Sequence, residues 1–154
     1  MASRTDEKLK ELGIELPTPA TPVANYVPYV VAGNLLTISG QIPMGPDGPE
    51  FIGKLGENVD VDEGQRAARL CAINVLAQAK AALGDLDRIK QVIKIQGFVN
   101  AAPDFTQHPA VINGASDLLA DVLEERGKHA RAAVGTSSLP LGVATEVDAI
   151  IEFE

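Results

Sequence analysis

The segment from Asp62 to Gly84 constrains the fold more than any other part of the chain. Its apolar residues recur at intervals of three and four, which is the period of one helix face. Gly84 supplies a helix stop. A face built from short side chains favours close packing of this helix on a sheet. That predicted face consists of Ala68, Cys71, Ala72, Val75, Leu76, Ala79, Ala82 and Leu83.

Strand-like stretches lie on both sides of this helix. Residues 26–32 and 35–39 are rich in β-formers, and the Gly33-Asn34 dipeptide between them suits a tight hairpin turn. A short third strand is expected at 50–55. Further strands are predicted at 91–99, 132–138 and 144–153, with a turn around Leu139-Pro-Leu-Gly142 joining the last two.

A second helix is expected between Pro109, which suits a first helical position, and Gly127. Its predicted face also consists of small and aliphatic residues: Val111, Ala115, Leu118, Leu119 and Val122. Helices therefore alternate irregularly with strands, without one helix for every crossover. This order predicts an α+β fold with a mixed sheet and both helices on one face.

Residues 1–22 are expected to form an N-terminal arm with a short helix at 5–13. Pro17, Pro19 and Pro22 end that helix and favour extended chain. The remainder, 23–154, has the size of a single domain with one core.

Charge and composition exclude several classes of protein. A net charge of −8 repels polyanions, and four Phe, two Tyr and no Trp offer little for base stacking, so nucleic-acid binding is not expected. Without an apolar leader or a run of ~20 apolar residues, the chain is expected to be cytoplasmic and to make no membrane contact. Cys71 lies in the helix stripe and is expected to be a small buried hydrophobe. His108 and His129 lack ligand spacing, so surface roles are expected for both.

The last predicted strand has two different faces. Thr145, Val147, Ala149, Ile151 and Phe153 alternate toward one face, where they can meet the helices. The other face carries carboxylates beside an isoleucine and has no predicted helical cover, so we expect an oligomer interface with polar sites. Its residues are Glu146, Asp148, Ile150 and Glu152.

Three segments together resemble the RidA family of enamine/imine deaminases, which is also called YjgF-like or endoribonuclease L-PSP. They are Tyr29 followed by Thr37-Ile-Ser-Gly-Gln-Ile-Pro43, then Asn74-Val-Leu-Ala-Gln-Ala-Lys-Ala-Ala-Leu-Gly84, then Ala130-Arg131 followed by Ser138-Leu-Pro140 and Glu146-Val-Asp-Ala-Ile150. The resemblance covers roughly 25–153. It implies a chorismate-mutase-like protomer of the bacillus type, a homotrimer with sites between subunits, and no metal or organic cofactor.

The resemblance also implies roles for seven residues. Arg131 corresponds to the arginine that holds the substrate carboxylate, a task suited to a planar guanidinium. Glu146 corresponds to the acid that orients or activates the attacking water. Backbone groups at Ser39, Gly40 and Ala133 are implied to position substrate and water. Tyr29 is implied to close the cleft, and Asn113 to reach the neighbouring subunit's site.

The implied activity is hydrolysis of 2-enamino or 2-imino acids, such as 2-aminoacrylate or 2-iminobutyrate, to 2-oxo acids and ammonia. Two departures affect it. Ala133 replaces a common cysteine, and Ser116 and Leu119 stand where aromatics are usual. A noncatalytic trimer that senses 2-oxo acids is therefore the alternative. An endoribonuclease or translation inhibitor is a third possibility, which the acidic charge disfavours.

One inference comes from strand geometry. If the last two strands form a hairpin, Glu146 pairs near Thr136, roughly 17 Å along the strand from Arg131. We therefore expect Arg131 and Glu146 to reach a shared ligand from different subunits, or through strong sheet twist.

Overall fold

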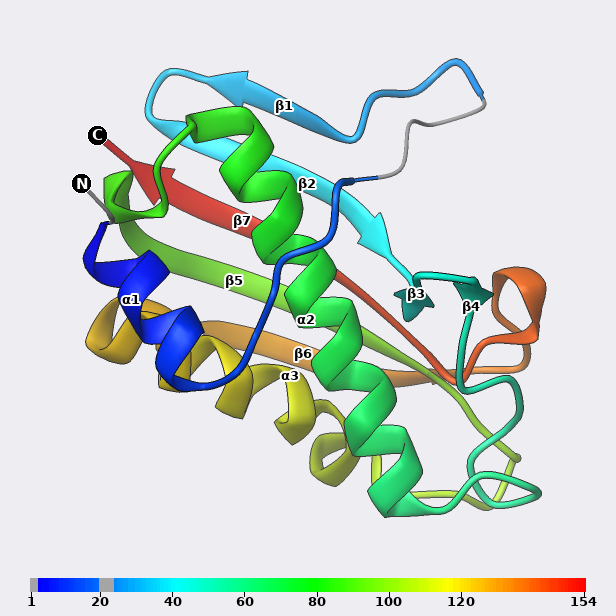
Figure 1. The fold of residues 1–154 in the computed structure, drawn as a ribbon. Coiled ribbons are helices and arrows are strands. Elements are labelled where there is room, and N and C mark those ends of the chain that lie inside the picture. Colours follow the sequence, from blue (N-terminus) through cyan, green and yellow to red (C-terminus); the bar gives the residue numbers. More distant parts are fainter. Residues whose placement is uncertain (1–2, 20–23) are drawn as a thin grey trace.

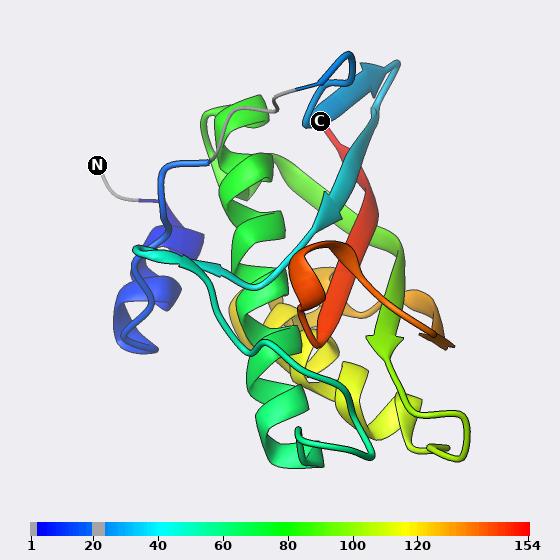
Figure 2. The ribbon, with the colours of Figure 1, turned by 90° about the vertical axis from the view of Figure 1, so that its right-hand side faces the viewer.

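The computed structural model describes residues 3–19 and 24–154 and shows two long helices on one face of a sheet (Figures 1 and 2). The helices are α2 (Val61–Leu83) and α3 (His108–Leu123). The sheet has the order β1-β2-β7-β5-β6. The mixed α+β prediction is confirmed. The five strands are β1 (Tyr29–Ala32), β2 (Leu35–Gln41), β5 (Ile89–Asn100), β6 (Ala130–Thr136) and β7 (Thr145–Phe153).

Short elements complete the chain. A small hairpin, β3 (Met44–Gly45) with β4 (Gly48–Pro49), follows β2. Single 3-10 turns lie before β5, after α3 and before β7: η1 (Leu86–Arg88), η2 (Glu124–Gly127) and η3 (Pro140–Gly142). Gly127 thus ends the helical segment as expected, although the α-helical part stops at Leu123.

The sheet topology corrects one prediction. β1 and β2 form the expected hairpin, and Gly33 turns it with a φ of 61°. However, β6 and β7 do not form a hairpin, because β5 lies between them. After α3, the chain enters β6 parallel to β5. It then crosses to the other side of β5, where β7 runs antiparallel. Glu146 consequently pairs with Phe98 and not near Thr136.

The predicted strand at 50–55 is also wrong. This stretch is a loop whose strand-like pairing with more distant segments is limited to isolated bridges, from Ile52 to Val143 and from Leu55 to Ala101. Phe51 has a φ of 56° and Gly53 a φ of 145°, and these angles interrupt any extended run.

The two helices and the sheet pack closely, as the short side chains predicted. The side chain of Asp60 caps α2 by accepting a hydrogen bond from the backbone N–H of Glu63. A Cβ added at Gly114 would collide with the Gln65 carbonyl, so α3 approaches α2 without room for a side chain there. A Cβ at Gly97 would lie 2.6 Å from the Ile112 side chain. The absence of a side chain at Gly97 therefore lets Ile112 of α3 pack directly on the sheet.

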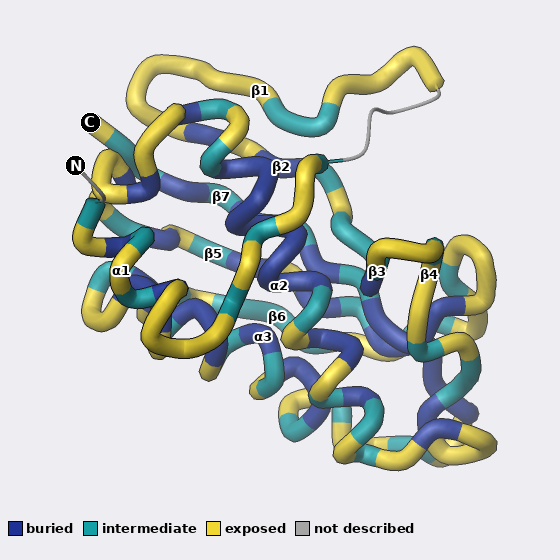
Figure 3. Tube along the Cα trace, in the orientation of Figure 1, coloured by how far each residue is buried: buried dark blue, intermediate teal, exposed yellow. Residues whose placement is uncertain are grey.

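No helix in the described part of the chain covers the opposite face of the sheet (Figure 2). In β7, the alternation is as predicted: Val147, Ala149 and Ile151 are buried, whereas Glu146 and Asp148 are partly exposed. Figure 3 shows buried positions along α2 and the central strands, and exposed positions along β1. Large apolar side chains remain exposed on strands of this sheet, among them Val30, Leu35 and Val134, which are 53%, 40% and 46% exposed.

The N-terminal arm packs against the domain. Its helix α1 (Arg4–Glu11) begins and ends slightly before the predicted bounds, and Thr5 and Leu9 are buried. Asp87 of η1 accepts hydrogen bonds from the Thr5 backbone N–H at 2.9 Å and the Thr5 hydroxyl at 2.6 Å. Pro22 and the expected boundary between residues 22 and 23 lie outside the described residues.

Cys71 is buried, as expected for a structural side chain, and burial raises the pKa of its thiol to about 12. Such a thiol is not ionised near neutral pH. The described part of the chain contains no helix that is both long and apolar enough to cross a bilayer.

Replacing Asn100 with alanine should lower the free energy of unfolding by about 2 to 4 kcal/mol. Asn100 is 5% exposed, and its amide donates to the Gly53 and Val143 carbonyls while its oxygen accepts from Lys54 at 2.7 Å. Alanine leaves these groups without their partner. Denaturant unfolding at fixed protein concentration measures the loss. The exposed Asn25→Ala is the control, and a loss below about 1 kcal/mol for Asn100→Ala would contradict the prediction.

Candidate functional site

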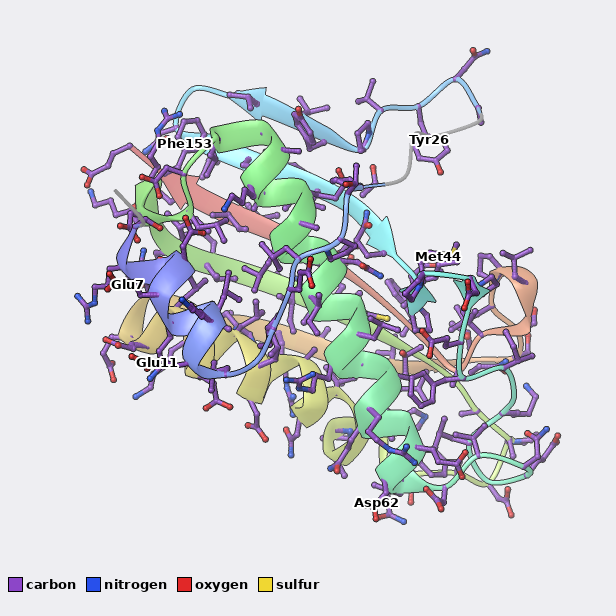
Figure 4. All side chains as sticks on the ribbon, viewed as in Figure 1. Glu7, Glu11, Tyr26, Met44, Asp62 and Phe153 are labelled. Carbon is purple, nitrogen blue, oxygen red and sulfur yellow. The ribbon has the colours of Figure 1, made fainter. Side chains whose placement is uncertain are left out.

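A cleft of about 1520 Å³ lies where β2 ends. Ser39, Gly40 and Glu146, three of the expected site residues, line it together with side chains of α2 and the segment 13–19. Tyr26 and Met44, on two segments that border the cleft, are labelled in Figure 4. The structure therefore brings part of the predicted site to one place.

Glu146 lies directly against the backbone of Gly40. A Cβ added at Gly40 would collide with the Glu146 carboxylate, so a side chain there would force Glu146 to move from its present position. The pairing of β2 with β7 shifts between Ile38 and Gln41, and this irregularity falls on Ser39 and Gly40. A strand irregularity of this kind exposes main-chain groups that a regular ladder would use.

Hydrogen bonds fix the end of β2. The Ser39 hydroxyl donates to the Val27 carbonyl at 2.8 Å, and the Gln41 side-chain amide donates to the Ser39 carbonyl at 2.9 Å. From α2, the Asn74 amide donates to the Ile42 and Met44 carbonyls at 3.0 and 3.2 Å. Asn74 thus anchors the chain just beyond Ser39 and Gly40. Helical periodicity alone does not reveal such a role, because it reports apolar faces.

The electrostatic surroundings of Glu146 suit proton transfer. Burial raises its pKa above the ordinary glutamate value, and the nearby negative charge of Asp148 raises it further. Burial also raises the pKa of Asp148, although the Gln96 backbone N–H and the charge of Lys94 oppose this. A carboxylate with a raised pKa exchanges protons closer to neutral pH.

Arg131 lies on the helix-covered side of the sheet. In β6 it pairs with Ile95, a fully buried residue under the helices. Its Nη1 donates to the Ser116 hydroxyl at 3.0 Å, and its Nη2 donates to the Pro109 carbonyl at 3.2 Å. Glu146, in contrast, pairs with Phe98 on the uncovered face. Within one chain, the two charged heads therefore project from opposite faces of the sheet.

Ala133 and Asn113 lie near Arg131. Ala133 follows Arg131 by two residues in β6, so it shares the helix-covered face, where it packs against the core. Asn113 is exposed and lies one helical turn from both Pro109 and Ser116 on α3. These residues form a group at the β6 edge of the sheet.

Tyr29 is separate from both groups. It pairs with Ile38 in the β1–β2 hairpin and packs partly against the core on the helix-covered face. It is not among the described residues that line the cleft, whereas the exposed Tyr26 is. Tyr26 lies three residues before Tyr29. The sequence predicted a strand from residue 26, but β1 begins at Tyr29, so Tyr26 belongs to the segment that leads into it.

Ser116 and His129 are further residues whose contacts the sequence did not indicate. Ser116 contacts both Arg131 and His129, and the His129 ring also contacts the Gly127 carbonyl. His129 was expected to lie on the surface, but its side chain is only partly exposed. These contacts link α3 to the start of β6. Among residues 3–19 and 24–154, no cluster of three His, Cys, Asp or Glu side chains is arranged to hold a metal ion.

Comparisons with known proteins agree with this architecture. The family model "YjgF/chorismate_mutase-like, putative endoribonuclease" matches residues 6–152. Protein TCP17 of Trypanosoma cruzi is 51% identical over 152 residues, which cover 98% of this chain and 95% of that protein.

Solved structures show the same fold. The protein Atu1372 of unknown function from Agrobacterium tumefaciens is 53% identical, with a TM-score of 0.92 over 97% of this chain and 92% of that one. RidA from an Antarctic Psychrobacter is 27% identical, with a TM-score of 0.62 over 88% and 94%. E. coli TdcF with bound serine is 28% identical, with a TM-score of 0.63 over 89% and 94%.

Proposed function

Because the chain belongs to the YjgF/RidA family, we propose that it hydrolyses 2-imino acids to 2-oxo acids and ammonia at sites between the subunits of a homotrimer. Small enamino acids such as 2-aminoacrylate enter the same reaction after tautomerising to the imine. The bound serine of TdcF supports a ligand of this size and charge in a relative. No metal or organic cofactor is needed for this chemistry.

The proposed reaction is addition of water to the C=N carbon. Arg131 holds the substrate carboxylate by charge-assisted hydrogen bonds. The reacting form is the protonated imine. Glu146 removes a proton from water as the C–O bond forms, and the C=N π electrons move to nitrogen, which gives a neutral carbinolamine with a hydroxyl and an amine on one carbon. Glu146 then gives that proton to the amine nitrogen, the C–N bond breaks, and the hydroxyl passes its proton back to the Glu146 carboxylate as the carbonyl forms. The released ammonia takes up this proton and leaves as ammonium, which restores the carboxylate. Backbone groups at Ser39, Gly40 and Ala133 position the reactants, and Asn113 and Tyr29 border the substrate.

The separation of Arg131 from Glu146 is the observation that carries this proposal. Arg131 is tied to α3 on the covered face, and Glu146 lies against Gly40 on the uncovered face. A ligand that needs both groups must therefore lie between two copies of the chain. The exposed apolar side chains of the sheet, such as Leu35 and Val134, supply surface for such an assembly.

Mixing two inactive variants tests this arrangement. Arg131→Ala lacks the carboxylate anchor and Glu146→Gln lacks the base, so each alone should be close to the uncatalysed rate. After joint unfolding and refolding at equal concentration, a site that takes Arg131 from one subunit and Glu146 from its neighbour is intact in about a quarter of cases. The mixture should therefore recover roughly a quarter of the wild-type activity.

The assay generates the imine in place with a dehydratase and follows 2-oxo acid and ammonia. The double variant Arg131→Ala/Glu146→Gln, mixed with wild type, serves as the control for refolding yield. A mixture that stays at the uncatalysed rate while wild type refolds to full activity would exclude a site shared between chains. Size-exclusion chromatography with light scattering measures the trimer independently.

Binding without turnover is the second candidate function, favoured by the methyl group of Ala133 where a thiol is common. Titration with 2-oxobutyrate separates the two. A sensor binds it through Arg131 but leaves imine hydrolysis at the rate in buffer, whereas a deaminase accelerates hydrolysis as well.

A further inference from the structure

We propose that Ser116 and His129 hold the Arg131 guanidinium in the orientation that receives the substrate carboxylate, an inference that rests on the proposed role of Arg131. Ser116 belongs to α3, and His129 lies between η2 and β6. The two therefore connect the elements on both sides of Arg131. Each acts through Arg131, so both are positioning residues.

Two nitrogens of the guanidinium are held by one helix. Nη1 donates to the Ser116 hydroxyl oxygen at 3.0 Å, and Nη2 donates to the Pro109 carbonyl at 3.2 Å. Two contacts fix both the position and the plane of a rigid fork. The guanidinium carries more N–H donors than these contacts use, so it can still bind a carboxylate.

The direction of each hydrogen bond follows from the Gly127 carbonyl. A carbonyl only accepts, so His129 Nδ1, at 2.6 Å from it, carries the proton. In the neutral ring, Nε2 is then an acceptor. The Ser116 hydroxyl, 2.9 Å away, must donate its single hydrogen to Nε2. Its oxygen lone pairs are consequently left for Arg131. Thus His129 sets the hydroxyl orientation that Arg131 needs.

This arrangement reduces the entropy that substrate binding must remove. Arginine has many rotamers, and Arg131 is only partly buried. Without these contacts, the side chain would lose its rotamer freedom when the ligand binds, and this loss of entropy would weaken the affinity. Immobilising one such side chain weakens binding by roughly two- to tenfold. The Ser116 contact is made before the ligand arrives.

Kinetics of four variants test the proposal. Ser116→Ala should raise KM for the imino acid by roughly three- to tenfold and change kcat by less than about twofold. Ser116→Thr keeps the hydroxyl and should bring KM back toward the wild-type value. His129→Leu removes the acceptor and should raise KM, whereas His129→Gln offers an amide oxygen in place of Nε2 and should raise it less. Asp121→Asn, an exposed position on the same helix, is the matched control.

Nuclear magnetic resonance of guanidinium groups gives a readout that does not need turnover. Contacts at two nitrogens slow rotation about the Arg131 C–N bonds, so its Nη protons should be resolved in wild type and averaged in Ser116→Ala. Wild type and Arg131→Ala both at the buffer rate would overturn the proposed function. Unchanged KM and unchanged Arg131 signals in Ser116→Ala would instead overturn the positioning role.

Discussion

Replacing Arg131 with lysine should lower kcat/KM for a 2-imino acid by roughly 10- to 100-fold, with most of the change in KM. Lysine keeps the charge but cannot present two parallel N–H donors to a carboxylate. It also cannot reproduce the simultaneous contacts with Ser116 and Pro109 that fix the guanidinium. Losing one charge-assisted hydrogen bond corresponds to about 1.5 to 3 kcal/mol.

The measurement is the dehydratase-coupled assay at several imine concentrations, together with calorimetric titration of 2-oxobutyrate. Arg66→Lys is the matched control, because Arg66 is exposed on α2 and lies over the Phe51 ring. Its kcat/KM should stay within about twofold of wild type. If Arg131→Lys matched the control in both measurements, the carboxylate would have another anchor.

Replacing Glu146 with glutamine should lower kcat by roughly 100- to 10,000-fold while KM changes little. Glutamine fits the same space against Gly40 but cannot accept a proton. KM should change little because Arg131, which lies on the other face of the sheet, binds the substrate carboxylate independently of Glu146. The folded state should not suffer, since a half-buried charge is replaced by a neutral amide.

The pH dependence of the wild type gives this prediction a second test. Burial, followed by the charge of Asp148, raises the pKa of Glu146. Because the ionised carboxylate is the base, activity should rise with pH through a midpoint above the ordinary glutamate range. Asp148→Asn removes the repulsion, lowers the pKa of Glu146 and should move the midpoint to lower pH. A midpoint that stays in place in Asp148→Asn, or persists in Glu146→Gln, would assign the titration to another group.

Local patterns in the sequence predicted most of the elements but not how they pair. The apolar periodicity of α2 and the alternation of β7 report which face each element buries, and both predictions are confirmed. The turn residues around Leu139-Pro-Leu-Gly142 suggested a hairpin. The partners of β7 are instead β2 and β5, and turn chemistry holds no information about strands that far away in the sequence. Likewise, Phe51 adopts a positive φ, which a phenylalanine in the sequence does not predict.

The candidate site was predictable to a similar extent. The alternation of residue types in β7 is sufficient by itself to assign Glu146 to the uncovered face. No such pattern assigns Arg131 to a face, because β6 consists mainly of small residues whose burial does not alternate. The Ser116 and His129 contacts depend on α3 and β6 lying side by side, which only the folded chain shows.

The central position of β7 has a consequence for synthesis on the ribosome. Of the five sheet strands, β7 is translated last, yet it lies between β2 and β5. Until it emerges, the edge of β2 that pairs with β7 has no hydrogen-bonding partner strand. The β5–β6 pair, with α3 as its crossover, can form earlier. Closure of the sheet is thus a late, long-range event, and the nascent hairpin is the segment that a chaperone would need to shield.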